Sequence, residues 1–146
     1  MKKKVSFDFD DTLSYEEVQN YARSLIEQGI EIHIVTSRYE DVTRYPFIVT
    51  DKRHEDILNV IKNLNINKDN IHFTNMENKY HFFEKNPDFI WHLDNDDQEI
   101  ALLNWHRDVH NKYVETNIGT IGVLFDYNYI YKCNELLGLS NNETKD

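Results

Sequence analysis

The chain has 146 residues, enough for one domain with one sizeable hydrophobic core and too few for two independent domains without crowding. Apolar residues make up 40% of it, with 8 Phe and 9 Tyr, which favours a packed globule over a disordered chain. The formal net charge of -10 argues against an extensive nucleic-acid-binding surface, because the phosphate backbone attracts basic surfaces. It leaves room for a local basic pocket.

The start of the chain does not predict export. Residues 2–4 are lysines, but Asp8, Asp10 and Asp11 follow where a signal peptide needs its apolar run. No segment approaches the roughly 18 consecutive apolar residues that a membrane helix requires. The single cysteine, Cys133, has no partner for an internal disulfide and fits a reduced compartment. We therefore expect a cytoplasmic protein with no membrane partner.

The first predicted elements are a strand, a helix and a second strand. A short apolar strand is expected over Lys4–Asp8 and another over Glu31–Thr36. Between them, Tyr15–Gln28 carries its apolar residues at helical spacing, and Gly29 stands where a helix commonly ends. This segment therefore has the order of a β-α-β unit.

The remaining elements repeat this alternation. Strands are expected at Asn70–Phe73, Phe89–Leu93 and Thr120–Phe125, and helices at His54–Leu64, Lys79–Lys85, Glu99–His110 and Ile130–Leu137. Alternating strands and helices predict an α/β fold in which helices cover a parallel sheet. Residues 1–139 are expected to form one domain, and 140–146 a polar C-terminal tail.

Polar side chains gather just after three of the predicted strands. In an open parallel sheet ligands bind beyond the carboxyl ends of the strands, so these side chains are expected to share one cleft. They are Asp8, Asp10 and Asp11, then Thr36, Ser37 and Arg38, and finally Asp94, Asn95, Asp96 and Asp97. Asp8 and Asp10 are two residues apart and face the same side of an extended chain. His92 stands in the same relation to Asp94, although a packing role is favoured for it over a ligand role.

Over residues 4 to 125 the chain resembles the haloacid dehalogenase (HAD) superfamily of aspartate-dependent phosphotransferases. Four elements occur in the family's order: Asp8-Phe9-Asp10-Asp11-Thr12-Leu13 resembles motif I, Val35-Thr36-Ser37-Arg38 motif II, Lys79 the motif III lysine, and Leu93-Asp94-Asn95-Asp96 motif IV. The resemblance implies a three-layer Rossmann-like fold with a five-stranded parallel sheet of order 5-4-1-2-3 and helices on both faces. No substantial cap is expected, because the helix from Tyr15 leaves no room after motif I and only the loop from Tyr39 to Lys52 remains after motif II.

The resemblance implies a phosphomonoester hydrolase that works through an aspartyl-phosphate. Asp8 would attack phosphorus in line. Asp10 would protonate the leaving alkoxide and then take a proton from the attacking water. A dehalogenase has no need for that second carboxyl, so Asp10 favours phosphoryl transfer over halide displacement.

An anionic phosphate approaches an anionic Asp8 only with a hard cation between them, and Mg²⁺ prefers oxygen ligands. By resemblance the ligands would be the carboxylates of Asp8 and Asp94 and the backbone carbonyl of Asp10. Thr36, Ser37 and Lys79 would bind the phosphoryl oxygens. Thr12 is expected to order the motif I turn.

Two positions depart from the family pattern. Asp11 stands where Gly is common, next to the expected metal. Asn95 stands where a second acid is common in motif IV, so Asp96 or Asp97 is considered for the outer carboxylate. For the role of the motif III lysine, Lys85 is the alternative to Lys79.

The loop after motif II is the candidate for substrate selection. It combines the basic residues Arg38, Arg44, Lys52 and Arg53 with the aromatic residues Tyr39, Tyr45 and Phe47, but also contains Glu40, Asp41 and Asp51. Such a loop is able to stack a base and contact a second phosphate, or is simply a mixed-charge surface. An open cleft suits a nucleotide, a nucleic-acid end or a phosphoprotein, and small substrates would need a partner subunit to exclude water.

Two non-hydrolytic alternatives are considered. A receiver-like module also gathers acids, Thr and Lys around a phosphorylated Asp, but there the Asp follows the third strand, where this chain has Phe73-Thr74-Asn75. The other alternative is an inactive relative that binds a partner.

Overall fold

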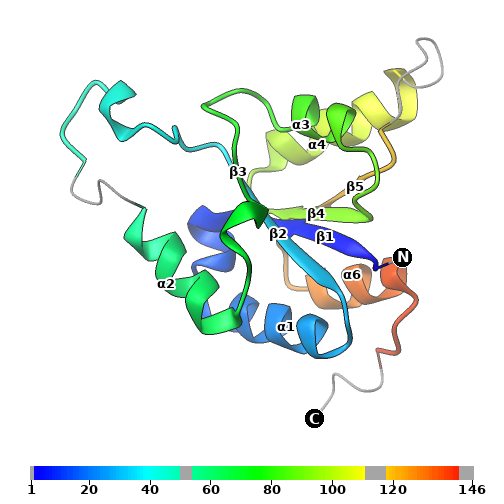
Figure 1. The fold of residues 1–146 in the computed structure, drawn as a ribbon. Helices are drawn as coiled ribbons and strands as arrows, with labels where there is room; N and C mark the ends of the chain where they lie inside the picture. Colours follow the sequence, from blue (N-terminus) through cyan, green and yellow to red (C-terminus); the bar gives the residue numbers. More distant parts are fainter. Residues whose placement is uncertain (1, 50–53, 111–117, 142–146) are drawn as a thin grey trace.

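The computed structural model of the chain describes residues 2–49, 54–110 and 118–141 (Figure 1). Its centre is a five-stranded, all-parallel sheet of order β3-β2-β1-β4-β5. The strands are β1 (Lys4–Phe7), β2 (Glu31–Thr36), β3 (Ile71–Phe73), β4 (Trp91–Asp94) and β5 (Ile121–Leu124). The α/β class and the predicted strand order are confirmed, since 5-4-1-2-3 is the same order counted from the other edge.

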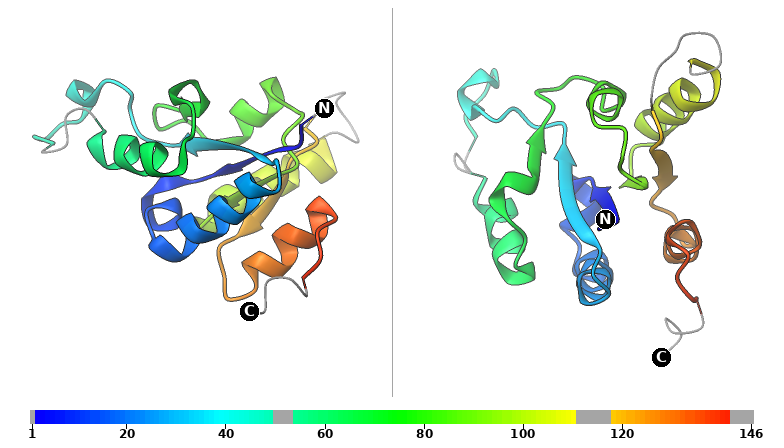
Figure 2. Two further views of the ribbon diagram at one scale, coloured as in Figure 1. Left: turned by 60° about the horizontal axis from the view of Figure 1, so that its bottom comes forward. Right: turned by 45° about the vertical axis from the view of Figure 1, so that its right-hand side comes forward.

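Helices cover both faces of the sheet (Figures 1 and 2). On one face lie α1 (Glu16–Glu27), α2 (Glu55–Leu64) and α6 (Tyr129–Leu137), and on the other α3 (Tyr80–Lys85) and α4 (Asp97–Trp105), which continues into the π-helical turn η4 (His106–His110). Three more short turns are η1 (Phe9–Leu13), η2 (Val42–Arg44) and η3 (Lys68–Asn70).

The core follows from strand alternation. Phe7 of β1 and Trp91 of β4 are fully buried and pack edge to face, at 5.3 Å between ring centroids, beneath α1 and α6. On the opposite face, Phe83 of α3 and Leu103 of α4 belong to a smaller buried cluster. Successive residues of a strand point to opposite faces, so Ser6 and Asp8 of the first strand segment turn toward the α3 and α4 side. This places the polar strand ends next to the start of α3.

The observed strands match the predicted ones within two residues at each end, and so do the helices when η4 is counted with α4, which alone ends at Trp105 where His110 was predicted. Strand β4 starts at Trp91 where Phe89 was predicted, and α4 starts at Asp97 where Glu99 was predicted. The earlier helix start has a capping reason, because the Asp96 carboxylate accepts the backbone N–H groups of Gln98 and Glu99. Gly29, with φ +82°, follows α1 as expected, and Gly138, with φ +73°, ends α6 in the same way.

Some predicted features fall outside the described residues. Residues 142–146 of the tail do, as do Asp51, Lys52 and Arg53 of the loop after motif II. Within residues 2–49, 54–110 and 118–141, every helix is too short or too polar to cross a bilayer.

Candidate active site

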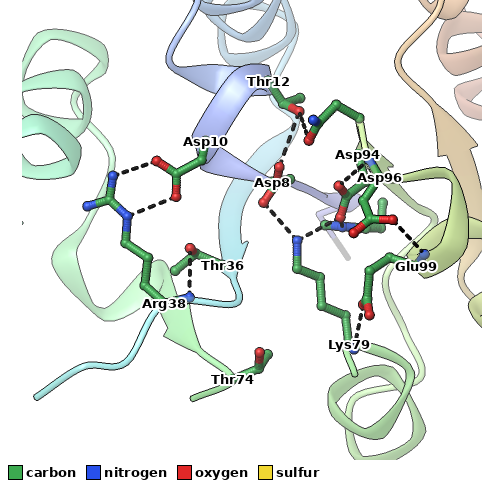
Figure 3. Close-up of polar contacts among 12 residues, drawn as sticks. Asp8, Asp10, Thr12, Thr36, Arg38, Thr74, Lys79, Asp94, Asp96 and Glu99 are labelled. Atoms are coloured by element: carbon green, nitrogen blue, oxygen red, sulfur yellow. Dashed lines mark hydrogen bonds and ion pairs between the residues drawn. The ribbon is translucent and has the colours of Figure 1, made fainter. Parts of the chain in front are cut away.

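The carboxyl ends of β1, β2 and β4 meet the start of α3 around a cleft of about 210 Å³ (Figure 3). It is lined by Asp8, Asp10, Asp11, Ser37, Met76, Glu77, Lys79, Asp94, Asn95, Asp96 and Glu99. Most of the predicted site residues therefore converge, although they come from segments up to 88 positions apart in the sequence, from Asp8 to Asp96.

A buried lysine joins two buried carboxylates at the base of this cleft. Lys79 Nζ donates to Asp8 Oδ1 at 2.7 Å and to Asp94 Oδ2 at 2.6 Å, and all three residues are at most 5% exposed (Figure 3). Glu99 on α4 holds the backbone of Lys79 in place, because its carboxylate accepts the Lys79 backbone N–H at 2.8 Å. The alternative, Lys85, is exposed and lines a different hollow. Lys79, and not Lys85, is thus the lysine that reaches Asp8 and Asp94.

The charges in this cluster do not balance. Burial raises the pKa of Asp8 to about 7; Lys79 opposes the rise, while Asp94 and Asp10 add to it. Burial alone would also raise the pKa of Asp94, but His92 and Lys79 hold it well below the ordinary range. Burial favours the neutral form of Lys79, yet Asp8 and Asp94 outweigh that effect and raise the pKa of the ammonium. One ammonium faces two carboxylates, so ionisation of Asp8 leaves excess negative charge that a cation would neutralise.

A chain of hydrogen bonds orients Asp94 from below. Ser6 Oγ lies 2.8 Å from His92 Nδ1, and His92 Nε2 lies 2.8 Å from Asp94 Oδ2. Burial lowers the pKa of His92, and Asp94 opposes this. The strand register pairs Ser6 with His92, so both point to the face that Asp94 occupies. Sequence reasoning expected a packing role for His92 and did not include Ser6; alternation along the two strands was the available signal.

The turn after β1 uses a backbone conformation that favours glycine. Asp11 has φ 58° and ψ 22°, in the left-handed region that Asp tolerates better than most residues. Its carboxylate accepts the Tyr15 hydroxyl at 3.1 Å, and its own N–H donates to Ser14 Oγ. The buried Thr12 hydroxyl donates to Asp8 Oδ2 at 3.3 Å, in keeping with its expected ordering role.

Asn95 lies against two of the expected metal ligands. One atom of its amide lies 2.9 Å from Asp8 Oδ2 and 3.2 Å from the Asp10 carbonyl oxygen, and hydrogen bonding favours the amide nitrogen in that position. Asn95 therefore contacts two of the groups that are expected to bind the metal, Asp8 and the Asp10 carbonyl.

The donor set fits a magnesium ion that retains waters. Among the described residues, no three His, Cys, Asp or Glu side chains are arranged to hold a metal by themselves. Mg²⁺ commonly uses one or two carboxylates and completes its shell with water and substrate oxygens. Asp8, Asp94 and the Asp10 carbonyl supply that number of protein oxygens.

Asp10 is held by an arginine. Arg38 Nε and Nη2 donate to its two carboxylate oxygens at 2.9 and 2.6 Å (Figure 3). Nη1 and Nη2 of Arg38 also donate to Asp56, at 2.9 and 2.6 Å. Burial would lower the pKa of the Arg38 guanidinium, but these two carboxylates raise it. Each Asp10 oxygen accepts one of these N–H groups, and more than half of the side chain stays exposed at the cleft, so the carboxyl keeps free acceptor positions on the cleft side.

The other predicted residues have different surroundings. Thr36 is fully buried, and its hydroxyl oxygen accepts the Arg38 N–H at 3.3 Å, whereas Ser37 lines the cleft. Asp96 lines the cleft while capping α4 and donating its N–H to Asp94 Oδ1 at 3.0 Å. Asp97 is exposed in the first turn of α4, outside the cleft lining.

Comparisons of the chain with protein-family models, curated proteins and solved structures found no match.

Proposed function

We propose that this protein is a Mg²⁺-dependent phosphomonoester hydrolase of the HAD type, which works through an aspartyl-phosphate on Asp8. The observation that carries the proposal is the buried Lys79 ammonium shared by Asp8 and Asp94 at the base of a polar cleft. Perturbed titratable groups that converge in a cleft are typical of catalytic sites. With the proposal go a capless cleft, a cytoplasmic location and a phosphorylated substrate.

The chemistry divides into two displacements. An Asp8 carboxylate oxygen bonds to phosphorus, the bond from phosphorus to the leaving oxygen breaks, and Asp10 gives that oxygen a proton. Water then bonds to phosphorus and gives its proton to Asp10, while the bond between phosphorus and Asp8 breaks. Inorganic phosphate leaves, and both carboxyl groups return to their starting states.

The residues around Asp8 prepare it for attack. Lys79 and Thr12 contact its two oxygens separately, at 2.7 and 3.3 Å, so the carboxylate is held in one orientation. The Lys79 ammonium is also suited to stabilise charge on the transferred phosphoryl oxygens. A magnesium ion held by Asp8, Asp94 and the Asp10 carbonyl would supply charge neutralisation between nucleophile and phosphate.

The order of the strands speaks against the receiver-like alternative. Receiver domains have the order 2-1-3-4-5, whereas this sheet runs 3-2-1-4-5 with Asp8 after its central strand. Beyond β3, where a receiver carries its phosphate-accepting Asp, stand Thr74 and Asn75.

The test measures phosphate release with and without Mg²⁺ against nucleotides, sugar phosphates, phosphopeptides and phosphate-ended oligonucleotides. We expect Asp8→Asn to abolish turnover and Asp97→Asn, at an exposed position outside the cleft lining, to retain it. Rapid quenching should trap a phosphoenzyme that is stable in acid and labile in alkali, and Asp8→Asn should not form it. Equal inactivity of wild type and Asp8→Asn on every class of substrate would contradict the proposal.

A further inference from the structure

A second hollow, of about 280 Å³, adjoins the catalytic cleft between the loop after β2 and the start of α2. Arg38, His54 and Asp56 form its polar side, and Val42, Tyr45 and Phe47 contribute its apolar side. Arg38 connects the hollow with the cleft, because it lines the hollow and donates to Asp10, which lines the cleft. A substrate with its phosphate at Asp8 therefore has a binding site for its remaining part beside Asp10.

The polar side of the hollow does not suit a second phosphate. Arg38 has five N–H donors, and all five are engaged: Nε by Asp10, Nη1 by Asp56 and His54, and Nη2 by Asp10 and Asp56. Two carboxylates also face this single guanidinium, so an added anion would be repelled. The phosphate contact considered for this loop from composition alone is thus unfavourable in the observed arrangement.

The apolar side suits a flat aromatic ring. Tyr45 and Phe47 lie 5.5 Å apart between centroids, and Tyr39 packs edge to face on Tyr45 at 5.0 Å. Phe47 nevertheless keeps 64% of its surface exposed, so a ring face remains available for stacking. The Tyr45 oxygen accepts the Tyr39 N–H at 3.2 Å, which leaves its hydroxyl proton to donate to a ring nitrogen or carbonyl.

We infer that this hollow holds the base of a nucleoside monophosphate whose phosphate lies at Asp8. Asp10 and Arg38 stand between Asp8 and the hollow, so the bound ring cannot be bonded directly to the phosphate, as it is in an aryl phosphate. A sugar provides the spacer. The net charge of -10 favours a free mononucleotide over a phosphorylated end of a long polyanion.

This inference rests on the proposed function, and the test separates the two. It compares kcat/KM for a purine and a pyrimidine nucleoside 5′-monophosphate, a 3′-monophosphate, ribose 5-phosphate, and oligonucleotides with a 5′- or 3′-phosphate. Phe47→Ala removes the exposed stacking surface, and Ile48→Ala on the same loop is the matched control, because Ile48 is 89% exposed and does not line the hollow. Isothermal titration of Asp8→Asn with a mononucleotide gives a reading that needs no turnover.

We expect a nucleotide to be hydrolysed with at least tenfold higher kcat/KM than ribose 5-phosphate. Phe47→Ala should reduce that ratio by about 5- to 150-fold, the range of one lost stacking contact, and Ile48→Ala should leave it unchanged. Affinity of Asp8→Asn for the mononucleotide should fall in parallel when Phe47→Ala is added. If a mononucleotide is the better substrate, or if an oligonucleotide end is, the result supports the base site. The preference then identifies which kind of molecule supplies the base.

Activity that depends on Asp8 but is equal for nucleotides and ribose 5-phosphate would overturn the base site while leaving the hydrolase intact. A ratio unaffected by Phe47→Ala would do the same. Loss of the proposed function is a different result, in which no phosphate ester is hydrolysed in an Asp8-dependent way.

Discussion

Replacing Asp8 by Asn should stabilise the protein in the absence of divalent cations. Asn keeps the size of the side chain, and its amide oxygen still accepts from Lys79, whereas its amide nitrogen donates to the Thr12 hydroxyl where Asp8 accepts from it. The substitution removes the charge that burial disfavours. The raised pKa of Asp8 means that the folded state binds a proton that the unfolded state has already released. The difference between the ordinary 3.8 and about 7, at about 1.4 kcal/mol for each pKa unit, corresponds to about 4 kcal/mol.

The sign of this effect fixes its pH dependence. The favourable contribution of protonated Asp8 is fully present below pH 3.8 and is lost as pH rises to about 7. Wild type should therefore lose stability between pH 4 and 7 relative to Asp8→Asn. We expect the variant to exceed wild type by about 2 to 4 kcal/mol at pH 8 and to match it near pH 4.

Urea denaturation in EDTA across this pH range measures the difference, and a thermal scan should show about 3 °C for each kcal/mol in a chain of this size. Asp97→Asn is the control, because that carboxyl is exposed and should leave the pH profile as in wild type. Adding Mg²⁺ should stabilise wild type more than Asp8→Asn, since a ligand stabilises the folded state that binds it. A variant less stable than wild type at pH 8, or a difference independent of pH, would refute the reasoning.

Lys79→Met should destabilise the protein by about 3 to 5 kcal/mol at pH 8, because it leaves Asp8 and Asp94 buried without their cation, whereas Lys85→Met on the exposed side of α3 should stay within about 0.5 kcal/mol of wild type. Equal urea midpoints for the two variants would contradict the shared-ammonium arrangement. Cys133 should resist thiol reagents in the folded protein, because it is fully buried and burial raises the pKa of its thiol. Labelling before unfolding, at the rate of a free cysteine, would show that Cys133 is not buried in the core as described.

Much of the site was predictable because successive side chains of a strand point to opposite faces of the sheet. The two-residue spacing of Asp8 and Asp10 marks them as belonging to one side of an extended chain, and the shared edge of parallel strands brings Asp94 close to them. Lys79 was predicted only through the order of the four motifs, since a lysine at the start of a helix has no distinguishing local pattern. The four motif positions and the sheet order were therefore available from sequence pattern and resemblance together.

The strands, the helices, the buried strand faces and the acids at the strand ends can be read from the amino-acid sequence, because they depend on periods of two and 3.6 residues along a short stretch of chain. Which side chains meet is established by folding: Ser6 and His92 support Asp94, Asn95 approaches the Asp10 carbonyl, and all five donors of Arg38 are taken. These contacts join loops distant in sequence, and their geometry depends on how the whole sheet positions the loop ends. Arg38 illustrates the difference. The composition of its loop suggested a phosphate ligand, whereas in the folded protein Asp10 and Asp56 engage its guanidinium and Arg38 lines the proposed base site.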